Sequence, residues 1–222
     1  MNSLKIEESF WMPVEIFVRK IKQKIFDDRI FLTRILAFGL IIFLLLSGSY
    51  WRTQSEIIQI IFLSFGIILS GVGAIGRIWC SVYIAGYKNK ILVVEGPYSM
   101  TRNPLYFFSL VGGIGFGLFT MTLTAPVFII IAFALYYPSV IKKEEERLES
   151  IYGDSFRSYK QKVPSFFPNF KIYSDPESFT VNARALQSQI PSSFSFILAL
   201  PGILAIHGFQ YLGWVKVFWT VY

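Results

Sequence analysis

Five long apolar runs, separated by polar segments, dominate the chain. They cover residues 35–50, 57–75 with a continuation toward 84, 105–123, 125–141 and 194–215. A helix needs about 20 mostly apolar residues to cross the hydrocarbon core of a bilayer, and its backbone groups must be paired within the segment. The pattern therefore predicts an all-α protein, a polytopic membrane bundle of about five transmembrane helices. Because Pro201, Gly202 and His207 interrupt the last run, four spans with a re-entrant fifth stretch are the alternative.

The polar segments divide the chain into five parts. Residues 1–34 are charged and amphipathic, which predicts a surface helix near 14–31 rather than a targeting peptide. Residues 122–126 alone join the third and fourth runs, which predicts a tight helical hairpin. The predicted parts are an N-terminal segment (1–34), two transmembrane helices (35–84), a core with the hairpin and a cytoplasmic amphipathic helix (85–170), a linker (171–193) and a last transmembrane helix (194–222).

Composition and charge support a membrane location and predict an orientation. Charged residues make up 16% of the chain, against about 25% in soluble domains. Seven Lys/Arg residues lie in 1–34, four in 76–104 and eight in 142–190. Because basic loops favour the cytoplasmic side, we expect these segments in the cytoplasm and the C-terminus outside. These loops account for the net charge of +7, so no nucleic-acid partner is expected.

The polar segment before the third run holds a first group of candidate site residues. Asn103 and Pro104 are typical of a turn that leads into a helix. The free N–H groups at the start of such a helix favour an anion, and the neighbouring Arg102 can hold a carboxylate or phosphate through two hydrogen bonds. The alternative is that Arg102 anchors the protein at lipid headgroups.

A second group follows the fourth run, where residues 142–147 read Lys-Lys-Glu-Glu-Glu-Arg. Apolar residues behind them recur at helical spacing and predict an amphipathic helix on the membrane surface: Leu148, Ile151, Tyr152, Phe156, Tyr159 and Val163. Glu144 and Glu145 begin its apolar side, and a carboxylate turned toward the protein at a membrane boundary is a candidate site. The alternative is a solvated run of charges with pairs such as Lys142 and Glu146.

The two groups resemble the signature of the isoprenylcysteine carboxyl methyltransferase and phospholipid methyltransferase superfamily, integral membrane enzymes that use S-adenosylmethionine. The matching positions, in chain order, are Gly96, Pro97, Tyr98, Arg102, Asn103, Pro104, Leu105, Tyr106, Glu144, Glu145, Tyr152, Gly153, Phe156, Tyr159, Val163 and Pro164. Asn103 replaces the usual histidine, and an amide does not titrate near neutral pH. Val140 stands where the family has an arginine for the carboxylate of a prenylcysteine, which argues against a prenylcysteine substrate.

The resemblance implies a cofactor, its contacts and a reaction. The implied contacts of S-adenosylmethionine are Lys90, Ile91, Leu92, Val93, Tyr98, Asn103, Pro104, Leu105, Tyr106 and Glu144. Arg102 is expected to take the carboxylate of the cofactor, and Glu145 is the nearest base for an amine acceptor, so these two are the predicted catalytic residues. We expect a membrane-embedded methyltransferase that acts on the carboxyl or amine of a lipid-like or hydrophobic acceptor from the bilayer.

Two other functions are compatible with the sequence. A non-catalytic membrane protein that keeps the fold is the first, and Asn103 and Val140 are its best support. An NADPH-dependent lipid reductase of related fold is the second, although the basic residues near residues 142–147, Lys142 and Lys143 among them, are few for a 2′-phosphate.

Overall fold

The computed structural model describes residue 39 and residues 42–43, 46–85, 87, 91–178 and 180–222. Residues 1–46 and 47–222 form two units, and every element from β1 onward belongs to the second. The surface helix expected near residues 14–31 lies outside the described residues, and so does most of the first predicted span.

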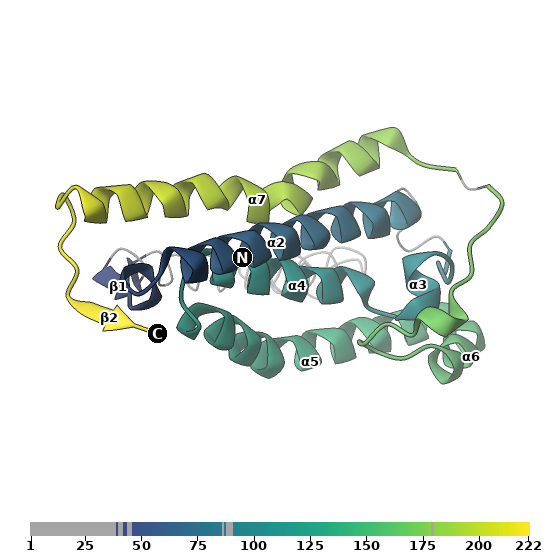
Figure 1. Ribbon diagram of the computed structural model, residues 1–222. Helices are drawn as coiled ribbons and strands as arrows, with labels where there is room; N and C mark the ends of the chain where they lie inside the picture. Colours follow the sequence, from purple (N-terminus) through teal and green to yellow (C-terminus); the bar gives the residue numbers. More distant parts are fainter. Residues whose placement is uncertain (1–38, 40–41, 44–45, 86, 88–90, 179) are drawn as a thin grey trace, which may run out of the picture. The chain divides into compact units, whose positions relative to one another are not determined.

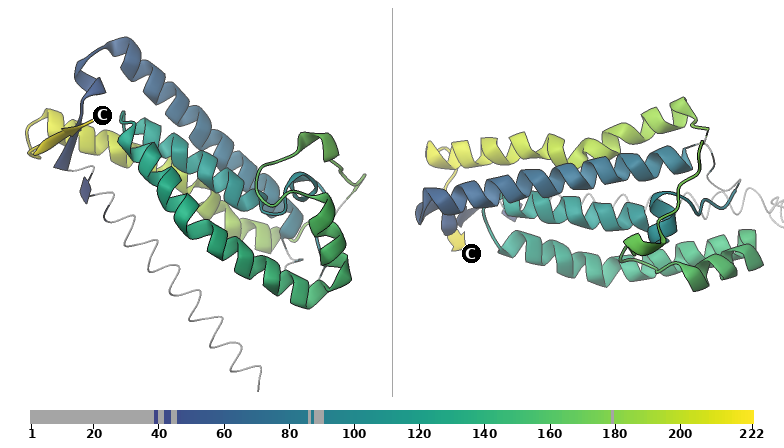
Figure 2. Two further views of the ribbon diagram at one scale, coloured as in Figure 1. Left: turned by 90° about the horizontal axis from the view of Figure 1, so that it is seen from below. Right: turned by 45° about the vertical axis from the view of Figure 1, so that its right-hand side comes forward.

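Apolar helices form the body of the second unit. α2 (Glu56–Ile84), α5 (Thr124–Tyr152) and α7 (Ala183–Tyr211) have 29 residues each and are long and apolar enough to cross a membrane. α4 (Pro104–Phe119) is also apolar but has only 16 residues. The helices lie side by side in the order α7, α2, α4, α5 (Figures 1 and 2). The predicted helical architecture is confirmed, while the count of five spans stays a prediction.

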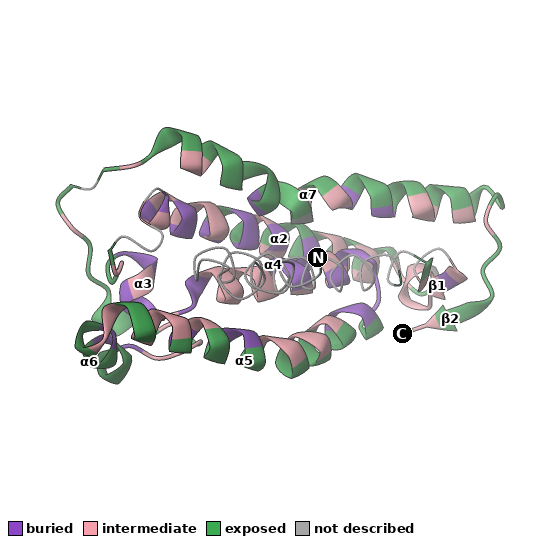
Figure 3. Cartoon of the chain, turned by 180° about the vertical axis from the view of Figure 1, so that it is seen from behind, coloured by how far each residue is buried: buried purple, intermediate pink, exposed green. Residues whose placement is uncertain are grey.

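Glycines bring the backbones of α2 and α4 into contact. A Cβ atom on Gly73 would lie 2.6 Å from the backbone nitrogen of Gly112 and 2.8 Å from the carbonyl oxygen of Phe108, so no side chain fits there. Small residues allow this close packing between membrane helices. Buried residues gather on α2 and α4, whereas outer surfaces expose large apolar side chains such as Ile57 and Leu135 (Figure 3). This exposed apolar surface suits contact with lipid.

Short elements lie at the two ends of the helices. α3 (Pro97–Met100), α6 (Asp154–Lys162) and η2 (Phe170–Ile172) gather at one end (Figure 1). At the other end η1 (Trp51–Thr53) lies near two parallel strands, β1 (Ser47–Ser49) and β2 (Trp219–Val221). β1 falls within the first predicted span, so the helix expected over residues 35–50 does not extend through residues 47–49.

α7 begins earlier than the apolar pattern predicts. Its first residue is Ala183, inside the stretch 171–193 that was expected to be a linker. Asn182 caps the helix, because its side-chain oxygen accepts a hydrogen bond from the Ala185 N–H at 3.0 Å. A polar first part of a helix escapes an argument based on hydrophobicity alone, although the capping asparagine is visible in the sequence.

Candidate functional site

The start of α4 is shaped by one glycine and one proline. Gly96 has a φ of +59°, a conformation that favours glycine, and a Cβ atom there would collide with the Tyr83 ring. The short helix α3 follows, and Pro104 then begins α4 at a position where the missing N–H breaks no helical hydrogen bond. Arg102 and Asn103 are thereby fixed directly before α4.

A second glycine folds the chain back after α5. Gly153 has a φ of +53° and separates α5 from α6. α6 then places Phe156 and Tyr159 in a buried apolar cluster against Leu92. The Tyr159 hydroxyl donates a 2.6 Å hydrogen bond to the carbonyl oxygen of Tyr98. The amphipathic stretch after the fourth run therefore packs against the segment that carries the first group of candidate residues.

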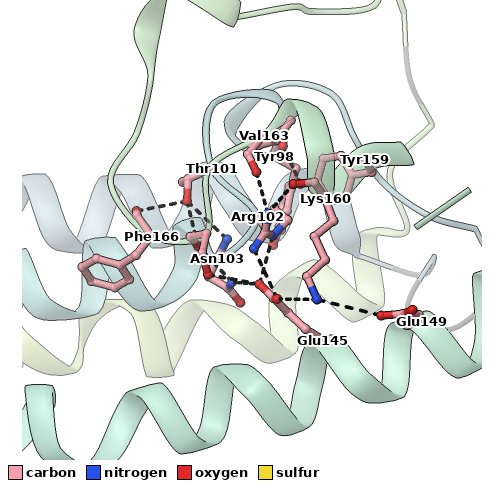
Figure 4. A network of polar contacts seen from close by, with 11 residues as sticks. Tyr98, Thr101, Arg102, Asn103, Glu145, Glu149, Tyr159, Lys160, Val163 and Phe166 are labelled. Atoms are coloured by element: carbon pink, nitrogen blue, oxygen red, sulfur yellow. Dashed lines mark hydrogen bonds and ion pairs between the residues drawn. The ribbon is translucent and has the colours of Figure 1, made fainter. Parts of the chain in front are cut away.

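A buried carboxylate joins the two groups (Figure 4). Glu145 is 8% exposed and accepts hydrogen bonds from Arg102 Nε at 2.9 Å and Nη2 at 3.3 Å. It also accepts hydrogen bonds from Asn103 Nδ2 at 3.2 Å and from Ser165 Oγ at 3.1 Å. Lys160 Nζ lies 3.9 Å from its second carboxylate oxygen. Residues far apart in the sequence are therefore neighbours at this end of the helices.

Arg102 is committed to protein partners. Besides its two bonds to Glu145, its Nη1 donates to the carbonyl oxygens of Lys160 at 2.8 Å and Val163 at 2.7 Å. Several donors around one carboxylate offset the cost of burying its charge. The expected roles of Arg102 as a ligand for the cofactor carboxylate and of Glu145 as a base stay predictions, and the geometry favours a positioning role for both.

A cavity of about 200 Å³ lies beside this network. It is lined by Ile84, Tyr87, Ile91, Leu92, Val93, Tyr98, Arg102, Asn103, Pro104, Leu105, Tyr106, Glu144, Arg147, Leu148, Tyr152 and Tyr159. Every predicted cofactor contact within the described residues is among them, whereas Lys90 lies outside the described residues. The predicted cofactor contacts within the described residues therefore surround a single cavity.

Three polar side chains give this first cavity its chemical character. The Tyr98 hydroxyl is buried and has no hydrogen-bond partner among the described residues. Burial also raises the pKa of Tyr98 well above its ordinary value, so its side chain stays a neutral phenol. Glu144 and Arg147 form an ion pair, with Arg147 Nη2 2.6 Å from Glu144 Oε1, and each side chain is 28% exposed.

These groups fit S-adenosylmethionine. A buried hydroxyl without a partner costs about 1–3 kcal/mol, and a ligand that forms the missing bond removes that cost. Leucine, valine and tyrosine side chains form walls suited to a nucleoside base, and the pair of opposite charges suits a charged amino-acid group.

A second cavity, of about 520 Å³, lies on the other side of Glu145. Its lining is mostly apolar and aromatic: Leu110, Ile130, Phe133, Ala134, Tyr137, Pro138, Ile141, Lys142, Glu145, Ser165, Phe166 and Phe167. Asn103 lines the first cavity and bonds to Glu145 in the second. Tyr106 lines the first cavity and contacts Tyr137, which lines the second, with ring centroids 5.1 Å apart. The linings of the two cavities are therefore in direct contact at these two pairs of side chains.

Sequence reasoning missed two functional candidates. Arg147 lies three positions after Glu144 on one helix. This spacing allows an ion pair, so the pair could have been predicted from the sequence. Ser165 donates to Glu145 and follows Pro164 in an irregular segment. No periodic pattern predicts where such a hydroxyl points, so its role needed the structure.

Comparisons with known proteins show what the chain is similar to. Residues 57–155 match the phospholipid methyltransferase family. The chain is 36% identical over 154 residues to the cobalt-zinc-cadmium resistance protein CzcN of Cupriavidus metallidurans, covering 69% of this chain and 70% of that protein. It is 30% identical over 190 residues to the nickel-cobalt-cadmium resistance protein NccN of Alcaligenes xylosoxydans xylosoxydans, covering 86% and 88%.

A more distant similarity extends to an enzyme. The protein-S-isoprenylcysteine O-methyltransferase of Schizosaccharomyces pombe is 29% identical over 87 residues, which cover 38% of this chain and 37% of the enzyme. No solved structure matches the chain. The ordered motif positions and these similarities together show that the chain belongs to the superfamily of phospholipid methyltransferases and isoprenylcysteine carboxyl methyltransferases.

Proposed function

We propose that the protein is an S-adenosylmethionine-dependent methyltransferase that acts on a hydrophobic acceptor taken from the membrane. One observation carries the proposal: the predicted cofactor contacts before α4, at the start of α4 and on α5 line one cavity, and Asn103 in this lining bonds to Glu145. When bound, S-adenosylmethionine supplies a methyl group activated by its positive sulfur. Positioning of donor and acceptor in a water-poor site is then the main task of the protein, and it can account for about 7–11 kcal/mol of a barrier.

The residues of the first cavity have distinct roles in this proposal. Leu92, Val93 and Tyr106 form walls for the nucleoside, and the Tyr98 hydroxyl supplies a hydrogen bond. Arg102 and Glu145 hold the start of α4 against α5, so that Asn103 keeps its place between the cavities. Arg102 and Glu145 are positioning residues here, in place of the catalytic roles suggested by the sequence.

The second cavity is the proposed acceptor site. Its apolar and aromatic lining suits an acyl or isoprenoid chain. Pro138 lies inside α5 at this cavity, and an internal proline removes a helical hydrogen bond and opens the helix locally. With the basic segments in the cytoplasm, the end with α3 and α6 faces the cytoplasm, where the cofactor is available.

Binding of S-adenosylhomocysteine to the purified protein in detergent tests the cofactor site. We expect saturable heat release in isothermal titration, and at least a tenfold loss of affinity in Tyr106→Ala because the cavity loses one aromatic wall. Tyr136→Ala is the matched control, since Tyr136 lies on α5 and is not part of the lining of either cavity. Absence of binding by the folded wild type at millimolar ligand would contradict the proposal.

Filling the second cavity separates acceptor binding from cofactor binding. Ala134→Phe places a ring in this cavity, whereas Ser139→Phe adds the same ring on α5 outside it. We expect Ala134→Phe to lower methyl transfer from labelled S-adenosylmethionine to membrane lipid extract by at least tenfold while the affinity for S-adenosylhomocysteine stays within twofold. Equal transfer rates in both variants would exclude this cavity as the acceptor site.

A further inference from the structure

Glu144 and Arg147 form an ion pair on α5, and both side chains line the first cavity. The pair is bidentate, because Arg147 Nη2 lies 2.6 Å from Glu144 Oε1 and Arg147 Nε lies 3.3 Å from Oε2. Arg102 is the other charged residue in the described lining, and it is bound to Glu145 and two carbonyl oxygens. A ligand that carries charge therefore meets the Glu144–Arg147 pair.

We propose that Glu144 and Arg147 together recognise the zwitterionic amino-acid end of the nucleoside ligand, with the ammonium at Glu144 and the carboxylate at Arg147. The assignment rests on the proposed function, and Arg147 takes the carboxylate contact that was expected at Arg102. A guanidinium binds a carboxylate through two parallel hydrogen bonds. Opposite charges on one carbon atom of the ligand are matched by opposite charges three positions apart on one helix face.

The energetics favour exchange of partners at this pair. Ion pairs with partial solvent exposure contribute about 0–1 kcal/mol, so exchanging the contact between Glu144 and Arg147 for contacts with a ligand loses little. The buried Arg102–Glu145 pair differs, because its side chains are 10% exposed and removing one partner leaves an uncompensated charge. A neutral pair also binds a neutral zwitterion without burying net charge, whereas a phosphate group would bring two negative charges against one arginine.

The test compares two ligands that differ only at the amino-acid end. S-adenosylhomocysteine carries the zwitterion, and 5′-methylthioadenosine shares its nucleoside and sulfur but lacks the amino acid. We expect Glu144→Gln and Arg147→Gln each to weaken S-adenosylhomocysteine at least tenfold in isothermal titration while methylthioadenosine changes less than threefold. Arg147→Lys keeps the charge but not the two-bond geometry, and it should restore part of the affinity.

Arg157→Gln is the matched control, because Arg157 forms an exposed pair with Asp154 at the same spacing and lies outside the cavity. Its affinities for both ligands should equal those of the wild type. Parallel losses for both ligands in the Glu144 and Arg147 variants, or no loss for either, would overturn the assignment while leaving the cofactor site intact. Failure of the wild type to bind either ligand would instead overturn the proposed function, and with it this assignment.

Discussion

Asn103 occupies the position of the family's histidine, and its amide nitrogen donates two hydrogen bonds within the network around Glu145. Its Nδ2 donates to Glu145 at 3.2 Å and to the Ser165 carbonyl oxygen at 3.0 Å, and the residue is 7% exposed. A neutral donor is suited to this place, because a carboxylate lies directly beside it. Asn103 therefore supports the charge of Glu145 by hydrogen bonding and needs no proton exchange of its own.

This arrangement predicts a pH-dependent loss of stability in Asn103→Asp. The variant places a second carboxylate beside Glu145. Two carboxylates in contact repel each other, so keeping both ionised lowers the stability of the folded state. We expect it to be less stable than Asn103→Ala at pH 8, where the alanine variant loses about 1–3 kcal/mol for an unmet hydrogen bond. The folded state takes up a proton as the pH falls toward 5, so the difference between the variants should shrink. Thermal denaturation in detergent at both pH values measures it, and a constant difference would contradict the prediction.

At the scale of elements, contact between α2 and α4 sets the position of the site, because α4 carries Asn103 at its start. Gly73→Ala places a methyl group against backbone atoms of Gly112 and Phe108. Backbone cannot move aside as a side chain does, so we expect a loss of about 1–3 kcal/mol. Gly71→Ala is the control on the same helix, since a Cβ there meets nothing within 4 Å and alanine favours a helix. Equal denaturation midpoints for the two variants would show that the helices do not pack at Gly73.

The elements also show what sequence could predict. Long apolar runs predicted α2, α4 and α5 because apolar length is nearly sufficient for a membrane helix. The residues of the ordered motif lie around the first cavity, where Gly96 and Gly153 set the local chain direction, and their role as cofactor contacts stays a prediction. β1 and the early start of α7 were missed, because short strand pairing and a polar first turn leave no strong hydrophobic signature.

For the molecule as a whole, the two ends of the helices differ in charge and in content. The end with α3 and α6 holds the proposed cofactor cavity and the network around Glu145, and the other end holds the paired strands β1 and β2 (Figure 1). If the basic segments face the cytoplasm, a ligand from the cytoplasm reaches the first cavity directly, and the strands lie on the opposite side of the membrane.

Single cysteines report this orientation, because the native Cys80 is fully buried and gives little background labelling. Ser158→Cys lies on the exposed face of α6, and Thr220→Cys lies exposed on β2. We expect a membrane-impermeant maleimide to label Thr220→Cys in intact cells and to label Ser158→Cys only after the membrane is opened. The reverse pattern would place the cofactor cavity outside, where S-adenosylmethionine is not supplied by the cytoplasm. Labelling of both positions in intact cells would show that both ends lie on one side and that the helices do not cross the membrane as proposed.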